Sequence, residues 1–144
     1  MARVRVSRVV DAPPRDVWRV VADLGGHARW QVDVREIQFT SPEHRGLGTT
    51  YDCDTQLGPI RTRIPMTVVE WRERKAVSVS YQGQLSGRGR ISLHRRRRQR
   101  TKVTWSARIR LPWFLGGPVG AIAAAQLLRV VWTRNLTNLA RELA

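Results

Sequence analysis

The chain has 144 residues, 42% hydrophobic and 26% charged, so it is long enough for one packed domain and too apolar for a disordered protein. Its net charge of +15 comes almost wholly from arginine, because Lys75 and Lys102 are the only lysines. This charge fits a nucleic acid or an anionic membrane as partner, and it also fits a general bias toward arginine on solvated surfaces.

Strand and helix patterns follow one another near the N-terminus. In residues 3–10, arginine alternates with valine, which predicts a half-buried strand with Arg8 out of place on its apolar side. Two prolines at 13–14 then begin a helix that runs through residue 23 and ends at a glycine pair. One more helical turn is expected at residues 27–30.

From residue 35 onward the hydrophobic period changes to two, which is typical of β-strands. Because short turns separate the strands, they should form antiparallel hairpins. Because each strand has one apolar face, only one side of the sheet should be covered. The six expected strands are residues 36–40, 46–57, 60–71, 77–82, 85–94 and 103–110.

The last segment, residues 118–143, predicts a long helix beginning at Pro118. A helix with apolar residues on two sides needs cover on most of its surface, and we expect the sheet to provide it. The uncharged run 111–128 is interrupted by prolines and glycines, so we interpret it as a loop and a buried helix, not a membrane span. One apolar set is Val119, Ile122, Ala123, Leu127 and Val130, and the other is Leu128, Val131, Trp132, Leu136, Leu139 and Leu143.

Together these elements predict an α+β fold in a single domain, residues 1–144. A seven-stranded, curved antiparallel sheet would wrap around the long C-terminal helix, with two short helices between strands 1 and 2. Gly83, Gly87 and Gly89 stand where larger inward side chains would fill the interior. The sequence therefore predicts an apolar cavity between sheet and helix, of the kind that binds small molecules.

Several segments occur in an order that characterises a known family. The entry segment is Val10-Asp-Ala-Pro-Pro-Arg-Asp-Val-Trp-Arg-Val-Val-Ala-Asp, followed by Trp30, residues 46–51, 68–71, 87–89 and 101–105, and the closing helix. In this order they resemble the polyketide cyclase/dehydrase and lipid-transport superfamily, whose START-like (SRPBCC) domains have the helix-grip fold. The resemblance spans nearly the whole chain. It implies the fold, and for function it implies a ligand carrier, a hydrolase or a cyclase.

In relatives that are cyclases, acid/base groups in the cavity act on a bound polyketide. The candidates here are His27 near the presumed cavity mouth, Tyr51 on an inward face, and Glu70. The direction of Glu70 depends on a bulge expected at Pro65, so it remains open. Whether the protein is an enzyme is therefore uncertain from the sequence.

Other chemistry has little support. The scattered histidines, with His44 and His94 at surface positions, form no metal-ligand set, and there is no glycine-rich phosphate loop, so neither metal nor cofactor is expected. Cys53 is the only cysteine, which excludes an intrachain disulfide. A single cysteine and the lack of a signal-peptide core at residues 1–6 favour a cytoplasmic location.

The residues predicted to contact a ligand lie on inward faces, where each would also fit as core packing. They are Trp30, Tyr51, Cys53, Tyr81, Gly87, Trp105, Leu128 and Trp132. A separate arginine cluster lies at the turn between the last two strands. Its members are Arg95, Arg96, Arg97, Arg98 and Arg100, and we interpret it as a solvated hairpin tip or a docking patch for an anionic membrane.

Three hypotheses for function follow. The first is a carrier that binds a small hydrophobic molecule such as a lipid, a polyketide or an isoprenoid in the cavity. The alternative is a polyketide cyclase or dehydratase that uses acid/base groups there. The third is binding of an anionic membrane or a nucleic acid by the arginine tip; nucleic acid is disfavoured because no exposed aromatic residues are interleaved with the arginines. The oligomeric state, monomer or homodimer, is left open.

Overall fold

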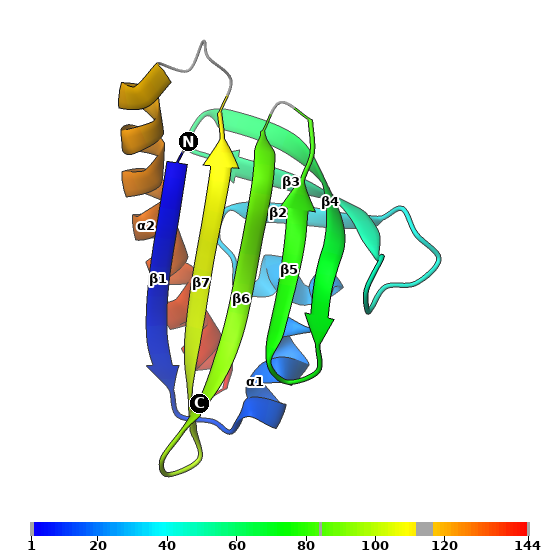
Figure 1. Cartoon of the computed structure of the whole chain (residues 1–144), viewed down its shortest axis with the longest axis vertical. Helices are drawn as coiled ribbons and strands as arrows, with labels where there is room; N and C mark the ends of the chain where they lie inside the picture. The colour runs from blue at the N-terminus through cyan, green and yellow to red at the C-terminus, as the bar shows by residue number, and fades with distance from the viewer. Residues whose placement is uncertain (1, 84, 112–116, 144) are drawn as a thin grey trace.

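The computed structural model describes residues 2–83, 85–111 and 117–143, and its central element is an antiparallel sheet of seven strands (Figure 1). The strands are β1 (Ala2–Val10), β2 (Val34–Phe39), β3 (Thr50–Leu57), β4 (Ile60–Arg72), β5 (Ala76–Tyr81), β6 (Ser86–Arg96) and β7 (Arg100–Arg110). The helices are α1 (Pro14–Val21), the 3-10 helix η1 (Leu24–Arg29) and α2 (Gly117–Glu142). This arrangement confirms the predicted α+β fold class.

Strands β2 to β7 pair in chain order, as the hairpin spacing predicted, and β1 closes the opposite edge. The order across the sheet is β1-β7-β6-β5-β4-β3-β2. β1 pairs with β7 along its whole length, which sets Val6 opposite Trp105 and Val4 opposite Ala107. The sheet twists and curls so that β2 and β3 cross behind β5 and β6 in Figure 1.

The strand pattern extended too far at one place. β3 begins at Thr50 and not at residue 46, because Gly46 and Gly48 have φ angles of 94° and 87°. A left-handed backbone of this kind interrupts an extended chain and is accessible chiefly to glycine. Residues 46–49 therefore belong to the loop between β2 and β3.

The helices pack on the sheet face that carries the core. In α1, Val17, Trp18 and Val21 are buried, and the helix contacts β6 and β7. α2 packs along β1 and contacts β7 less extensively. Arg8, out of place in the sequence pattern, remains exposed, and its Nη1 donates a hydrogen bond to Thr137 Oγ1 of α2 at 3.2 Å. This arginine therefore links β1 to the helix at the protein surface.

The two apolar sets of α2 have different surroundings. In the second set, Trp132, Leu136 and Leu139 are buried, and Leu128, Val131 and Leu143 are partly buried against the core. In the first set, Val119, Ile122, Leu127 and Val130 are exposed. The expectation that the sheet covers most of the helix is wrong for this set, because a sheet packs against only one side of a helix. No helix in the described ranges combines the length and the hydropathy needed to cross a membrane.

Candidate functional site

Three tryptophans occupy the space between the sheet and the second half of α2. Trp105 of β7 stacks on Trp132 of α2 with ring centroids 4.3 Å apart, and Trp30 meets Trp105 edge-on at 5.8 Å. None of the three is more than 6% exposed. Aromatic packing therefore closes this part of the interior, and contact of these rings with a ligand stays a prediction.

Tyr51, Cys53 and Tyr81 belong to the same interior, on β3 and β5. Tyr51 and Cys53 are buried, and Tyr81 is partly buried against the core. Burial raises the pKa of Cys53 to about 11, so its thiol is protonated at neutral pH. Burial likewise raises the pKa of both tyrosines. These groups are neutral hydrogen-bonding side chains, and none of them is an activated nucleophile.

The glycines expected to leave a cavity are explained differently. A Cβ on Gly89 would overlap the Tyr81 hydroxyl, so the ring of this tyrosine already occupies the space above Gly89. Gly87 has a φ of 144°, and a Cβ there would overlap a backbone carbonyl of β7. Gly83 has a φ of 97° beyond the end of β5. The interpretation of Gly87 and Gly89 as empty space is therefore wrong; they permit close packing.

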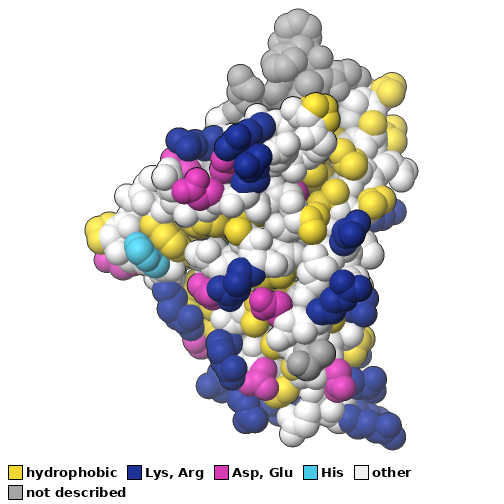
Figure 2. Space-filling view, turned by 180° about the vertical axis from the view of Figure 1, so that it is seen from behind, with side chains coloured by type: hydrophobic (Ala, Val, Ile, Leu, Met, Phe, Trp, Pro, Cys, Tyr) yellow, Lys and Arg dark blue, Asp and Glu magenta, His cyan; other side chains and the backbone are white. Residues whose placement is uncertain are grey.

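Several apolar side chains next to the closed core are only partly buried, and we call them together the half-covered surface. Its members are partly buried side chains: Met66 of β4, Val79 and Tyr81 of β5, Leu85, Leu111, and Ala125 and Leu128 of α2. α2 packs along β1 at the sheet edge, whereas β5 lies three strands further in. Figure 2 views the molecule from the α2 side and shows hydrophobic side chains exposed there. Residues from both the sheet and the helix thus remain incompletely covered.

Asp33, which the sequence reasoning missed, is a buried acid between η1 and β2. It is 7% exposed, and its Oδ1 accepts a hydrogen bond from Asn135 Nδ2 of α2 at 2.9 Å. Asn135 Oδ1 in turn accepts a hydrogen bond from the Val32 N–H at 2.8 Å. Burial raises the pKa of Asp33, although the Asn135 hydrogen bond opposes this shift. The negative charge of Asp33 is one of the causes that raise the pKa of Cys53 and of Tyr81. The Asp33 carboxylate therefore lies near both side chains.

One signal in the sequence pointed to this network. Asn135 is an amide within the apolar set of α2, three residues after Trp132 and four before Leu139. An amide at a helical core position requires a buried partner. The sequence does not identify the partner of Asn135. Asp33 precedes the period-two pattern that begins at residue 35, so the pattern does not predict on which side its side chain lies.

His27 is buried, so the alternative of a solvated loop histidine does not hold. It is 7% exposed, its Nε2 lies 2.8 Å from the Val21 carbonyl oxygen, and its ring meets Trp30 edge-on at 5.3 Å. Burial lowers the pKa of His27, so the neutral imidazole donates through Nε2 to this carbonyl. The ring therefore joins the end of α1 to η1, and a catalytic role for His27 stays a prediction.

Glu70 points away from α2, because the bulge in β4 lies between Val68 and Glu70 and not at Pro65. The extra residue puts Glu70 opposite Ser78 on the outer face. Its Oε1 accepts hydrogen bonds from Ser78 Oγ at 2.6 Å and Arg90 Nε at 2.8 Å. These bonds lower the pKa of Glu70 to about 2. An ionised carboxylate on the outer face is not a candidate acid/base group for the interior.

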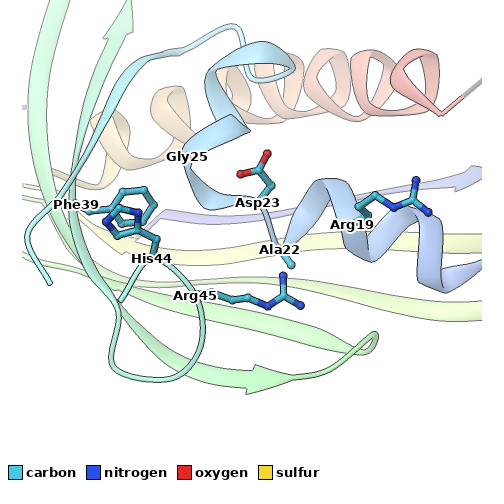
Figure 3. Close-up of a pocket in the computed structure, with 7 residues that line it drawn as sticks. All are labelled: Arg19, Ala22, Asp23, Gly25, Phe39, His44 and Arg45. Atoms are coloured by element: carbon cyan, nitrogen blue, oxygen red, sulfur yellow. The ribbon is translucent and has the colours of Figure 1, made fainter. Parts of the chain in front are cut away.

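A surface hollow of about 540 Å³ opens beside α1 and η1 (Figure 3). It is lined by Arg19, Ala22, Asp23, Gly25, Phe39, His44 and Arg45. The His44 ring stacks on Phe39 with centroids 3.9 Å apart, and Arg45 pairs with Glu73 at 2.7 Å. His44 is exposed at the surface, as expected. Because these side chains already have partners within the chain, we assign no ligand to this hollow.

The predicted arginine cluster lies at the hairpin that joins β6 and β7, at the lower end of the molecule in Figure 1. Arg95, Arg96, Arg97, Arg98 and Arg100 are all exposed. Arg98 and Gln99 have φ angles of 60° and 58°, so the tip is a tight turn. Contact of this tip with a membrane or a nucleic acid stays a prediction. Within residues 2–83, 85–111 and 117–143, no three acidic, histidine or cysteine side chains gather as metal ligands.

Comparisons with known proteins agree with this architecture. Similar structures include a Thermus thermophilus protein with 19% identity, a TM-score of 0.83, and coverage of 96% of this chain and 94% of that one. A START superfamily protein from Mycobacterium smegmatis has 15% identity, a TM-score of 0.77 and complete coverage of both chains. A Thermobifida fusca protein has 22% identity, a TM-score of 0.75, and coverage of 97% and 91%. These similarities establish the START-like fold, and no curated protein matches the sequence significantly.

The sequence itself assigns the family. The model of the polyketide cyclase/dehydrase and lipid transport family matches residues 1–144, the entire chain. The protein belongs to the polyketide cyclase/dehydrase and lipid transport family.

Proposed function

We propose that this protein binds a small, mainly hydrophobic molecule against the half-covered surface, between the inner face of β4 and β5 and the first half of α2. The supporting observation is that apolar side chains on both sides of this space are only partly buried, while the neighbouring core is closed by tryptophans. Burial of these side chains by an apolar ligand would be favourable at about 25 cal/mol for each Å² removed from water.

Leu128 and Tyr81 are the predicted ligand residues that best fit this location. Leu128 lies on the inward side of α2, one helical turn before the buried Trp132. Tyr81 ends β5, opposite Met66 of β4. Its neutral hydroxyl would orient a polar group of the ligand, because burial raises the pKa of Tyr81 and keeps the proton in place.

The test uses Leu128→Trp, which would fill the proposed space, and Leu127→Trp as the matched control. Leu127 precedes Leu128 in α2, is 49% exposed and belongs to the other apolar set of the helix. Fluorescence titration with dansyl-undecanoic acid should give saturable binding to the wild type and to Leu127→Trp. Leu128→Trp should bind about tenfold more weakly or worse. Equal affinity of both variants, or no saturable binding to the wild type, would rule the site out.

Asp33 supports a second candidate function, acid/base catalysis on a bound carbonyl compound, as in a cyclase or dehydratase. It is a buried carboxyl group, which such chemistry needs, whereas the Glu70 carboxylate lies on the outer face of the sheet. Burial raises its pKa, and its charge influences Tyr81 on the half-covered surface. Its carboxylate would take a proton from a carbon next to a carbonyl group, and Tyr81 would donate a hydrogen bond to the resulting enolate oxygen.

The second candidate is tested by proton exchange without knowledge of the natural substrate. An alkyl 1,3-diketone in D₂O should exchange its central protons faster with the wild type than with Asp33→Asn, as measured by proton NMR. The matched control is Glu70→Gln, a carboxyl replacement on the outer face that should leave the exchange rate unchanged. Equal exchange rates for wild type and Asp33→Asn would exclude Asp33 as the base and leave the binding function standing.

A further inference from the structure

The outer face of α2 carries an apolar stripe in its first half. Val119, Ile122, Leu127 and Val130 are 76%, 64%, 49% and 69% exposed, and Ala123 is exposed with them. Their spacing of three and four residues places them on one side of the helix. Figure 2 shows hydrophobic side chains along this side of the molecule. An exposed apolar stripe on a surface helix marks an interaction site.

Basic residues continue the same helix face toward its C-terminal end. Arg134 and Arg141 follow Val130 at helical spacing, and both are exposed. Arg129 is exposed beside the stripe, and Arg8 of β1 reaches the same region through Thr137. These four arginines are absent from the ion pairs that the described residues form.

Acidic groups are nearly missing from this helix. Glu142 is the only acidic residue in residues 117–143, and its Oε1 lies 3.5 Å from Arg29 Nε. The outer face of α2 therefore combines exposed apolar side chains with arginines whose charge is not neutralised on the helix. Membrane-surface helices have this combination, because apolar side chains enter the lipid boundary while basic ones bind lipid phosphates.

We propose that the outer face of α2 docks on an anionic lipid surface. Charge decides between this partner and a second copy of the chain. Two copies that each carry +15 would repel one another at an arginine-flanked interface, whereas anionic lipid headgroups attract the same arginines. The site is different from the arginine tip, which lies at the β6–β7 hairpin and lacks a comparable apolar stripe among its own residues, 95–100.

Vesicle sedimentation tests the proposal directly. The wild type should sediment with phosphatidylcholine vesicles that contain about a quarter phosphatidylglycerol, and not with phosphatidylcholine alone, at about 0.1 M salt. The double variant Ile122→Ser/Val130→Ser should lose about tenfold in binding. Leu47→Ser/Ile60→Ser is the matched control, because these residues are also exposed, at 71% and 62%, but lie in the β2–β3 loop and at the start of β4, not on α2. Circular dichroism would establish that both variants are folded.

A second pair of variants separates the two basic regions. Arg134→Gln/Arg141→Gln should weaken vesicle binding several-fold, and Arg97→Gln/Arg98→Gln at the hairpin tip should not. The proposal is overturned if only the hairpin pair matters, if the stripe variant binds like the wild type, or if phosphatidylcholine binds equally well. A wild-type dimer that Ile122→Ser/Val130→Ser dissociates, without any vesicle binding, would assign the stripe to a second copy instead.

Insertion is measured without disrupting the stripe. Cys53 is buried, so Cys53→Ser provides a background for a single labelled cysteine at position 122. An environment-sensitive dye at Ile122→Cys should shift to shorter wavelength with phosphatidylglycerol vesicles, and the same dye at Ile60→Cys should not. Because no bound ligand is involved, failure here would leave the proposed ligand site untouched, and failure of the ligand titration would leave this proposal untouched.

Discussion

At the scale of single residues, environment determines which ionisable groups stay charged. Glu70 and Asp33 are both carboxyl groups, yet hydrogen bonds from Arg90 and Ser78 lower the pKa of Glu70 while burial raises the pKa of Asp33. The first therefore stabilises the outer face of the sheet as an anion. In Asp33, burial favours the protonated carboxyl group, and the hydrogen bond from Asn135 favours the ionised one.

Glu70 should make stability depend on pH. Its pKa is about 2 in the folded chain against 4.5 in the unfolded chain, so its contribution is fully present above pH 4.5 and is lost as the pH falls toward 2. Glu70→Gln should lower the free energy of unfolding at pH 7 by about 1–2 kcal/mol, reduced from the full shift because Arg90 is partly exposed. Urea unfolding at several pH values measures this. Glu43→Gln in the exposed β2–β3 loop is the control, and a difference that persists at pH 2 would contradict the assignment.

Gly89 and Tyr81 should behave as a coupled pair. Gly89→Ala puts a methyl group where the Tyr81 hydroxyl lies, which should cost about 1–3 kcal/mol of stability. In the Tyr81→Phe background the hydroxyl is gone, so the same substitution should cost clearly less. A double-mutant cycle by thermal and urea unfolding gives the coupling. Additive effects would mean that the two side chains do not compete for this space.

At the scale of elements, α2 is attached to the fold by two different means. Its second half is fixed by aromatic stacking of Trp132 on Trp105 and by the buried amide of Asn135. Its first half has partly buried residues on one side and the exposed stripe on the other. The aromatic stacking and the buried amide thus fix the second half of α2, and the proposed ligand and lipid sites both lie on the first half.

Asn135→Ala should destabilise the protein by about 2–4 kcal/mol, because it leaves the buried Asp33 carboxylate and the partly buried Val32 N–H without their partner. Loss of this hydrogen bond raises the pKa of Asp33 further, so the penalty should grow as the pH rises through the range where Asp33 ionises. Asn138→Ala is the matched control on the same helix. Asn138 is partly buried and donates only to the Trp30 carbonyl oxygen at 3.2 Å, so about 1 kcal/mol is expected. Equal penalties by urea unfolding would contradict a central role of Asn135.

At the scale of the whole molecule, two features affect the stability of the fold: a strand pair that joins distant parts of the chain, and a large positive charge. β1 and β7 are neighbours in the sheet although about a hundred residues separate Val6 from Trp105. This pairing places β1 beside β7 along the sheet edge on which α2 packs. The folded domain contains 26 lysines and arginines and only 11 acidic residues, so like charges repel one another across its surface.

Salt should therefore stabilise the protein. Repulsion among like charges opposes the compact state, and added salt screens charges that are more than about 8–10 Å apart. The melting temperature should rise by a few degrees between about 0.02 and 0.3 M NaCl. Sodium chloride is preferred to sulfate or phosphate, which strengthen apolar burial by themselves. A melting temperature that falls with NaCl would show that the surface ion pairs outweigh the repulsion.

Much of the fold was determined by local sequence pattern. Alternation of polar and apolar residues located the strands, prolines located the start of α1, and two apolar sets at helical spacing located α2. These signals are readable because they come from the geometry of one element at a time. The hairpin spacing also predicted the antiparallel sheet, which the strand order confirms, and the resemblance to the family is confirmed by the match over residues 1–144.

Only the tertiary structure decided which side chains meet and which remain exposed. A bulge of one residue in β4 places Glu70 on the outer face. The Tyr81 ring occupies the space above Gly89. Asn135 donates a hydrogen bond to Asp33, about a hundred residues earlier in the chain. It also decided that Ile122 and the other residues of the exposed stripe lie outside the core. Periodicity shows that one side of a helix is apolar. Whether that side contacts the core, a ligand or a lipid depends on which surfaces the rest of the chain covers.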